Sequence, residues 1–315
     1  MQAATALRRL IAMQPIPQLS ALEQLNFLLT NRIPRNFATR CMGWYSRLQS
    51  RRLTRFSIAV WQLFADDLNL GEARESEFRS LQECFTRELR EGARPVDARA
   101  DSVCSPCDAE VGAMGRIEGG RVYQAKGFPY ELQDLIPDTA VRERYRDGLF
   151  ITLRLKSSMY HRFHAPLDCE LREVNYIRGD TWNVNPVALR RVEKLFCKNE
   201  RVVLDLQAAS GPLGICLVPV AAILVASIRL HCLRDPLDLS YRGPRRIACD
   251  AVYAKGQQMG YFQHGSTIVL FARRGYAFQP GIDSGKRIFA GQALLQAPPV
   301  TDPEPGNGRL LQEMH

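Results

Sequence analysis

The sequence predicts an α+β fold, in which a helical N-terminal region precedes a β-rich core. Apolar residues recur at helical spacing in two early segments: Leu53–Leu68, where Phe56 and Val60 mark the apolar side, and Ser76–Arg90. From about Val103 onward, short apolar runs alternate with Gly, Pro, Asp and Asn, which is typical of strands joined by turns. The 315 residues are 46% hydrophobic and 24% charged, the composition of a globular protein with a large core.

The longest apolar run, Leu213–Ile228, predicts one or two buried strands, because it is rich in Val, Ile, Leu and Ala and contains Pro219. It is too short to cross a bilayer, which takes about 20 apolar residues. Pro15 and Pro17 interrupt the first apolar stretch, and no cleavage site for a signal peptidase follows it. We therefore expect a protein that stays in the cytoplasm without a membrane-spanning segment.

Positive charge is concentrated at the N-terminus. Residues 1–56 contain nine arginines, no lysine and one acid, so they carry +8 of the formal net charge of +9. Apolar and aromatic residues, among them Trp44 and Tyr45, lie between the arginines. A basic arm usually binds nucleic acid or anionic lipid, and the apolar content favours an anionic membrane surface over nucleic acid. Alternatively, the arm packs on its own domain and keeps its arginines in solvent.

The nine cysteines are odd in number and spread along the chain without framework spacing, which predicts reduced and mostly buried thiols. Cys104 and Cys107 form one Cys-x-x-Cys pair. A structural zinc site needs a second pair at matching distance, and His231–Cys232 is not a recognised one. We therefore expect no metal.

Two of the five histidines, His161 and His164, fall within four residues of each other. A lone histidine is usually structural, but such a pair indicates a general base or a metal pair. On a strand, residues three apart face opposite sides, whereas in a turn their side chains can converge.

Two further segments carry possible chemistry. Gly265–Thr267 leads into an apolar run. In the structural interpretation, Gly265 permits a turn and Ser266 caps it. In the catalytic interpretation, a base takes the proton of the Ser266 hydroxyl, which then attacks the Gly265 carbonyl. Asp108, which follows Pro106 and Cys107, is either a turn residue or a functional acid. Neither segment is specific alone.

Taken together and in order, six segments resemble the phosphatidylserine decarboxylase family over roughly Phe78–Gln292. They are Ser105–Asp108, Gln124–Gly127, Tyr160–Pro166, Asn183–Pro186, Asn199–Val202 and Met259–Thr267.

The resemblance implies a role for each matching residue. It implies self-cleavage between Gly265 and Ser266, with Asp108 and His164 completing a charge-relay triad with Ser266. It implies a role in decarboxylation for His161, either in returning a proton or in positioning the substrate carboxylate. Two positions depart from the family pattern: acids are usual where Gln257 and Gln258 stand, and glycine is usual near Ala221.

The resemblance also implies the products and the cofactor. Cleavage gives a β chain of residues 1–265 and an α chain of residues 266–315, with a covalent pyruvoyl group derived from Ser266. That group forms a Schiff base with the substrate amine and accepts the electrons left by CO2, the task that pyridoxal phosphate performs elsewhere. The expected reaction converts phosphatidylserine to phosphatidylethanolamine, and the family resemblance suggests a homodimer.

These expectations divide the chain by role. Residues 1–70 form a basic, amphipathic, membrane-associating helical region and residues 71–315 a catalytic domain, located peripherally on the cytoplasmic face of the cell membrane. Nucleic acid is not an expected partner.

Three alternatives differ in chemistry. A soluble pyruvoyl-dependent decarboxylase of a free amino acid has no use for the apolar basic arm. An unprocessed lipid-binding relative has no use for an intact set of site residues. A hydrolase that keeps its serine as nucleophile does not need a Gly–Ser bond.

Overall fold

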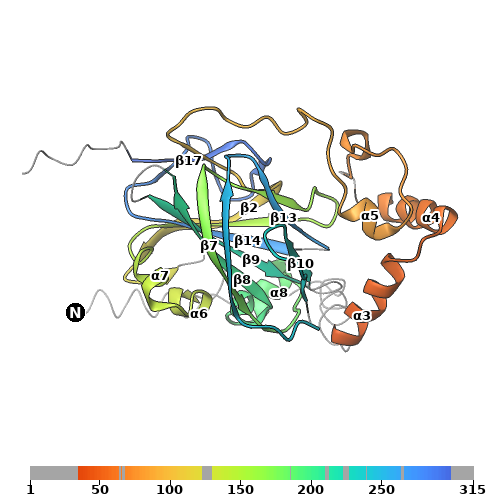
Figure 1. The fold of residues 1–315 in the computed structure, drawn as a ribbon, viewed down its shortest axis with the longest axis horizontal. Helices are drawn as coiled ribbons and strands as arrows, with labels where there is room; N and C mark the ends of the chain where they lie inside the picture. Colours follow the sequence, from red (N-terminus) through yellow and green to blue (C-terminus); the bar gives the residue numbers. More distant parts are fainter. Residues whose placement is uncertain are drawn as a thin grey trace, which may run out of the picture.

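The structure, a computed structural model, describes residues 35–63, 65, 68–122, 130–184, 186–209, 213–222, 227–238, 240–263 and 266–298. Residues 1–34 of the basic arm and Gly265 therefore lie outside the described residues. Figure 1 shows a β-rich body with the first described helices gathered at one end, so the predicted α+β class is confirmed.

Three antiparallel sheets account for the strands of the described residues. The largest follows the order β12 (Arg246–Tyr253), β7 (Cys169–Ile177), β8 (Arg201–Ala208), β9 (Gly214–Ala221), β14 (Ser266–Ala272), β5 (Leu149–Leu155), β2 (Ala109–Glu118), β3 (Arg121–Val122) and β4 (Tyr130–Glu131), and β16 (Arg287–Ile288) also pairs with β2. The second follows the order β11 (Leu237–Asp238), β10 (Ser227–Leu230), β13 (Gln258–Phe262) and β6 (Arg162–His164). The third is β1 (Ser102–Cys104), β17 (Ala293–Gln296) and β15 (Ala277–Phe278).

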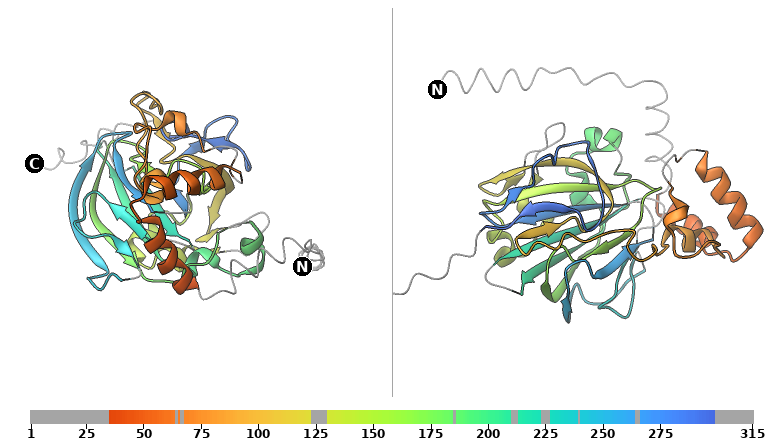
Figure 2. Two further views of the ribbon diagram at one scale, coloured as in Figure 1. Left: turned by 90° about the vertical axis from the view of Figure 1, so that its right-hand side faces the viewer. Right: turned by 90° about the horizontal axis from the view of Figure 1, so that it is seen from above.

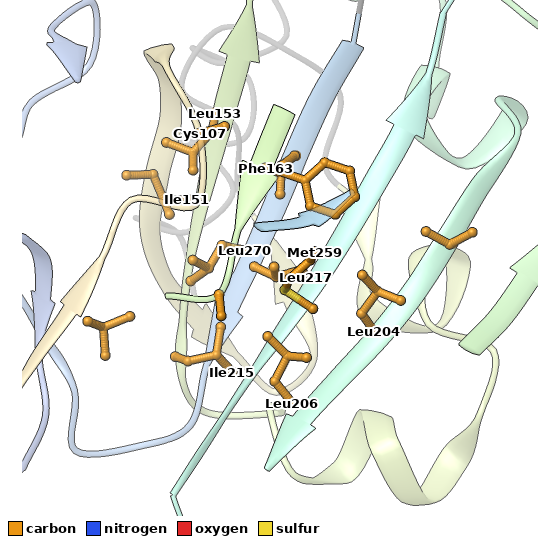
Figure 3. Packing of buried hydrophobic residues seen from close by; sticks show 14 of the residues in the cluster. Cys107, Ile151, Leu153, Phe163, Leu204, Leu206, Ile215, Leu217, Met259 and Leu270 are labelled. Atoms are coloured by element: carbon orange, nitrogen blue, oxygen red, sulfur yellow. The ribbon is translucent and has the colours of Figure 1, made fainter. Parts of the chain in front are cut away.

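The core lies on both faces of the largest sheet. On one face, Leu217 and Leu270 meet Phe163 of β6 and Met259 of β13, as Figure 3 shows. The opposite face is covered by the short helices α6 (Leu132–Leu135), α8 (Pro186–Arg191) and α9 (Leu195–Lys198). Because β9 and β14 are buried on both faces, they read as continuous apolar runs rather than alternating ones.

The strand predictions hold closely. The apolar run at residues 213–228 contains β9 and the start of β10, which confirms the expectation of buried strands. The bridging pairs of β8 and β9 skip Val218 and Pro219, and Pro219 has no N–H to donate. All nine cysteines are free thiols and five are buried, as predicted.

The helix predictions are wrong in extent. The described helices near the N-terminus are α3 (Arg35–Ser46), α4 (Arg51–Gln62) and the short α5 (Leu81–Phe85), with α7 (Thr139–Glu143) further along. The expected helix over residues 76–90 is reduced to α5, because the Arg87 guanidinium is buried and donates to the carbonyls of Leu68 and Ser158. These bonds hold the chain after α5 in a loop.

The apolar side predicted for the helix over residues 53–68 also differs. Phe56 and Val60 of α4 are 67% and 39% exposed, whereas Ile58 and Trp61 pack on a small cluster that includes Phe78. No helix among the described residues is long and apolar enough to cross a membrane.

Candidate active site

Ser266 is the first residue of β14, the strand between β5 and β9 in the largest sheet. It lies opposite Leu155 on one side and Ala221 on the other. The side chain is fully buried, and its Oγ has no hydrogen-bond partner among the described residues. Leaving a buried hydroxyl unpaired costs about 1–3 kcal/mol, so this group is a candidate for function.

Asp108 lies between β1 and β2 and is 1% exposed. Arg94 clamps it through two donors, Nε to Oδ1 at 2.8 Å and Nη2 to Oδ2 at 2.6 Å. The backbone N–H of Ala290 donates to Oδ1 at 2.9 Å, and Arg94 also contacts Glu72 at 2.8 Å. Two parallel charge-assisted bonds fix both the position and the orientation of the carboxylate.

His164 closes β6 and has partners on both ring nitrogens. Nδ1 lies 2.9 Å from the Gly256 carbonyl, and Nε2 lies 3.0 Å from the Tyr160 hydroxyl. Because a carbonyl only accepts, we assign the proton to Nδ1, so that Nε2 accepts from Tyr160. Gly256 presents this carbonyl from a backbone with φ of +80°, which favours glycine.

The environment of His164 favours the neutral imidazole. Burial lowers the pKa of His164, although the hydrogen bond to Gly256 and the negative charge of Asp108 oppose this effect. The backbone N–H of His164 donates to Pro106 at 2.7 Å, which places β6 beside the Asp108 segment. Within the described part of the chain, however, the Asp108 carboxylate bonds to Arg94 and Ala290 rather than to the His164 ring.

His161 is fully buried in different surroundings. Its Nδ1 donates to the Met159 carbonyl at 2.7 Å, and its ring lies 4.0 Å from that of Phe85, measured between centroids. Its carbonyl accepts from the N–H of Phe262, the last residue of β13, at 3.0 Å. His161 therefore lies where the chain leaves β13 toward Ser266.

The two histidines thus occupy opposite ends of β13. His164 pairs with Gln258 at the beginning of the strand, whereas His161 contacts its last residue. The two histidines are three residues apart in the chain. At about 3.3 Å per residue, the separation of their backbones along the strand is on the order of 10 Å. The sequence left open whether the two side chains converge, and their distinct partners show separate sites.

Glu200 is a further buried acid close to Ser266. It precedes β8 and accepts a hydrogen bond on Oε1 from the Tyr176 hydroxyl, which also donates to the Asp238 carbonyl at 3.2 Å. Its Oε2 has no partner among the described residues. Burial raises the pKa of Glu200 to about 7, although the hydrogen bond from Tyr176 opposes the shift.

One strand separates Glu200 from Ser266. The Glu200 carbonyl accepts from the N–H of Ala221 at 2.8 Å, and Ala221 lies opposite Ser266. Since directly opposed residues project from the same face of a sheet, the two side chains share a face with only a methyl group between them. In the sequence, Glu200 stands out only by its place in the segment Asn199–Val202.

Of the departures from the family pattern, Gln257 and Ala221 are accommodated, whereas the buried Nε2 of Gln258 has no hydrogen-bond partner among the described residues. Gln257 accepts from the N–H of Ala254 at 2.9 Å and so closes the turn that carries Gly256. Ala221 is 2% exposed and keeps its register with Ser266. No group of three or more His, Cys, Asp or Glu side chains among the described residues is arranged to hold a metal ion.

Comparison with known proteins shows which family the chain belongs to. The sequence profile of phosphatidylserine decarboxylase matches residues 81–296, which is more than half of the chain. The chain belongs to the phosphatidylserine decarboxylase family. The family resemblance inferred from the six segments is thereby confirmed.

Curated relatives agree over most of the length. A phosphatidylserine decarboxylase proenzyme of Yersinia enterocolitica is 34% identical over 294 residues, covering 90% of this chain and 99% of the relative. Proenzymes of the same name from Vibrio parahaemolyticus and Yersinia pestis are 34% identical over 270 residues and 33% identical over 293 residues. They cover 82% and 89% of this chain, and 94% and 99% of their own lengths.

The decarboxylase profile spans all the candidate site residues, from Arg94 to Ser266. Helices α3 and α4 precede the matched range, so a role for them has to be argued from their own surfaces.

Proposed function

We propose that this protein is a phosphatidylserine decarboxylase proenzyme, which cleaves itself between Gly265 and Ser266 and then converts phosphatidylserine to phosphatidylethanolamine. The observation that carries the proposal is the buried, unpartnered Ser266 hydroxyl at the head of a central strand, in a chain of this family. The soluble and unprocessed alternatives are not favoured, because the relatives that cover most of the chain are curated as proenzymes of this lipid decarboxylase.

Self-cleavage needs only groups of this chain and water. A histidine takes the proton of Ser266 Oγ, which attacks the Gly265 carbonyl; the peptide C–N bond breaks and an ester forms. Elimination of the ester releases the Gly265 carboxylate and leaves dehydroalanine at position 266. Tautomerisation and hydrolysis then release ammonia and leave a pyruvoyl group, with residues 1–265 and 266–315 as separate chains.

The family resemblance supports His164 as the base and Asp108 as its acid. A neutral His164 suits this role, and its Nε2 becomes available when Tyr160 gives up its hydrogen bond. Asp108 acts on His164 through its charge, which favours the protonated imidazole as the Ser266 proton arrives. Arg94 holds Asp108 in place.

For decarboxylation, the pyruvoyl group supplies a carbonyl that binds the substrate amine and accepts the electrons left by CO2. The buried, unpartnered Ser266 hydroxyl fits a residue that is converted in place. We assign to His161 the return of a proton to the substrate or the positioning of its carboxylate, because it lies where β13 leads toward Ser266.

A denaturing gel with intact-mass measurement tests self-cleavage. Purified protein should give two fragments split after Gly265, and the smaller should lack a free α-amino group. Ser266→Ala should remain one chain, whereas the exposed control Ser284→Ala should be cleaved normally. One full-length band from folded wild-type protein would rule the proposal out.

Membrane binding is supported by the surface of α3 and α4. Trp44, Phe56, Val60 and Leu63 are 67%, 67%, 39% and 76% exposed, and only Val96 and Val252 are other exposed large apolar residues in the described ranges. Figure 2 shows that these helices project from one end of the β body. An exposed apolar patch on a basic helix pair fits an anionic membrane, so we assign residues 1–70 to docking on the cytoplasmic face of the cell membrane and residues 71–315 to catalysis.

Sedimentation with vesicles that contain anionic lipid tests this docking. Full-length protein should pellet with these vesicles. At high salt it should pellet less but still measurably, because salt screens the attraction of the arginines and not the burial of apolar side chains. Deleting residues 1–50 should release it and reduce turnover of vesicle-embedded substrate more than turnover of a short-chain soluble analogue. If the truncated and full-length proteins pelleted equally, the docking proposal would be wrong, and the arm would be a helix pair with a structural role only.

We assign the interface of the proposed homodimer to the edge of the largest sheet. In the described part of the chain β12 pairs on one side only, and Val252 on it is 72% exposed. An open edge strand is a ready site for pairing with a second copy. Light scattering should give twice the monomer mass for the wild type and a monomer for Val252→Lys; a wild-type monomer would refute the dimer.

A further inference from the structure

A cavity of about 300 Å³ lies between α3 and the second sheet. Arg40, Trp44 and Arg47 line it from the helix, and Ser227, Asp238 and Gln263 line it from the sheet. The cavity therefore joins the exposed end of the molecule to the strands that lead into the candidate active site.

Two residues of the cavity wall connect it to the candidate active site. Gln263 comes three residues before Ser266 and donates its N–H to the Ser227 carbonyl at 3.2 Å. The neighbouring Asp238 carbonyl accepts from Tyr176, the same hydroxyl that contacts Glu200.

One polar group in this wall has no partner. Ser227 is 4% exposed, and its Oγ makes no hydrogen bond to any residue that the structure describes. Because a buried hydroxyl left unpaired is unfavourable, Ser227 is suited to accept a polar ligand that enters the cavity.

The outer wall offers two guanidinium groups that form no ion pair with any residue the structure describes. Arg40 and Arg47 are seven residues apart, about two turns, so they lie on one side of α3 with Trp44 between them. Both are exposed, and neither forms an ion pair within the described ranges. By contrast, Arg55 and Arg79, farther along the chain, pair with glutamates.

The residues that α3 contributes to the cavity are of the types that prefer the lipid headgroup region. Trp44 is 67% exposed, and tryptophan prefers the headgroup level of a membrane. Arginines one turn to either side would then lie at the level of the phosphates, and a guanidinium matches phosphate oxygens in geometry as well as charge.

We propose that Arg40 and Arg47 bind the phosphodiester of the bilayer phospholipid substrate and hold its headgroup in this cavity, with the serine end directed toward Ser266. This inference rests on the proposed decarboxylase function and adds how the headgroup is recognised. The polar inner wall, with Ser227, Asp238 and Gln263, faces the charged amino and carboxyl groups of that serine.

The test uses full-length, self-cleaved enzyme and two substrates: phosphatidylserine in neutral phosphatidylcholine vesicles, and soluble glycerophosphoserine. Arg40→Gln and Arg47→Gln should each raise KM for both substrates about tenfold, the cost of losing an exposed charge-assisted hydrogen bond. Their kcat should stay within about twofold. Self-cleavage should be unchanged, because it needs no substrate.

Arg52→Gln is the matched control. Arg52 is exposed on α4, lies outside the cavity and forms no ion pair within the described residues, so its loss removes the same charge from the arm. It should change KM for glycerophosphoserine less than twofold. Unchanged KM for glycerophosphoserine in the Arg40→Gln/Arg47→Gln double variant would overturn the inference, as would equal effects of Arg47→Gln and Arg52→Gln. Wild-type enzyme that neither cleaves itself nor releases CO2 would instead overturn the proposed function.

Discussion

Glu200→Gln should make the stability of this protein less dependent on pH. In the unfolded chain Glu200 loses its proton near its ordinary pKa of 4.5, whereas burial in the folded protein raises the pKa to about 7. Between these values the folded state binds the extra proton, so the contribution of this group to the free energy of unfolding falls as pH rises and is constant above about pH 7.

The magnitude follows from the two pKa values. The difference between about 7 and 4.5 corresponds to roughly 3 kcal/mol, since each pKa unit is worth about 1.4 kcal/mol. Glutamine cannot ionise and can still accept the hydrogen bond from Tyr176. The variant should therefore gain stability relative to the parent between pH 4.5 and pH 8, by up to that amount.

Urea unfolding at several pH values from 5 to 8 measures the difference. Both proteins should carry Ser266→Ala, so that each unfolds as a single chain and all other titrating groups cancel in the comparison. Parallel curves for the two proteins across this range would show that Glu200 is already ionised in the folded state and would refute the reasoning.

Three further predictions concern the candidate site. Ser266→Ala, His164→Ala and Asp108→Asn should each leave a single chain on a denaturing gel, because members of such a unit fail together; normal cleavage in His164→Ala would move the role of base to His161. His161→Ala should still be cleaved, at least partly, yet release no CO2 from phosphatidylserine, and equal loss of both activities would argue against separate roles. Arg94→Met should lower the free energy of unfolding by about 3 kcal/mol and slow cleavage, because it leaves the buried Asp108 carboxylate without its cation, whereas Arg94→Lys should retain part of both; unchanged urea midpoints would contradict this.

The sheet could be predicted from the sequence because its central strands are buried on both faces. The apolar run at residues 213–228 contains β9, and the apolar run that follows Gly265–Thr267 forms β14. Runs of this kind, bounded by turn residues, have few alternatives in a globular chain.

The helical region was less predictable, since helical periodicity does not reveal which side is covered. Phe56 and Val60 follow the spacing of a core-facing stripe but are exposed, and the opposite side of α4 packs on the protein. Likewise, the loop after α5 depends on the burial of Arg87, whose partners Leu68 and Ser158 are distant in sequence.

In the candidate site, too, the local sequence predicts some residues, whereas contacts between distant residues could not be predicted. Motifs identified Asp108, His161, His164 and Ser266, but not the groups that hold them. The Arg94 clamp and the hydrogen bond from His164 to Gly256 join residues 14 and 92 positions apart, and no local pattern encodes such pairs.

The position of β14 constrains how the mature enzyme is made. All seven of its residues pair with β5 on one side and with β9 on the other. On the proposed cleavage, this strand becomes the start of the small chain while both neighbours remain in the large one. A strand in the middle of a sheet cannot be inserted afterwards without opening the sheet, so the fold must be complete before the bond is cut. The two chains of each enzyme molecule then derive from a single translation product, and mixing isotopically light and heavy enzyme should yield no hybrids until the sheet is unfolded.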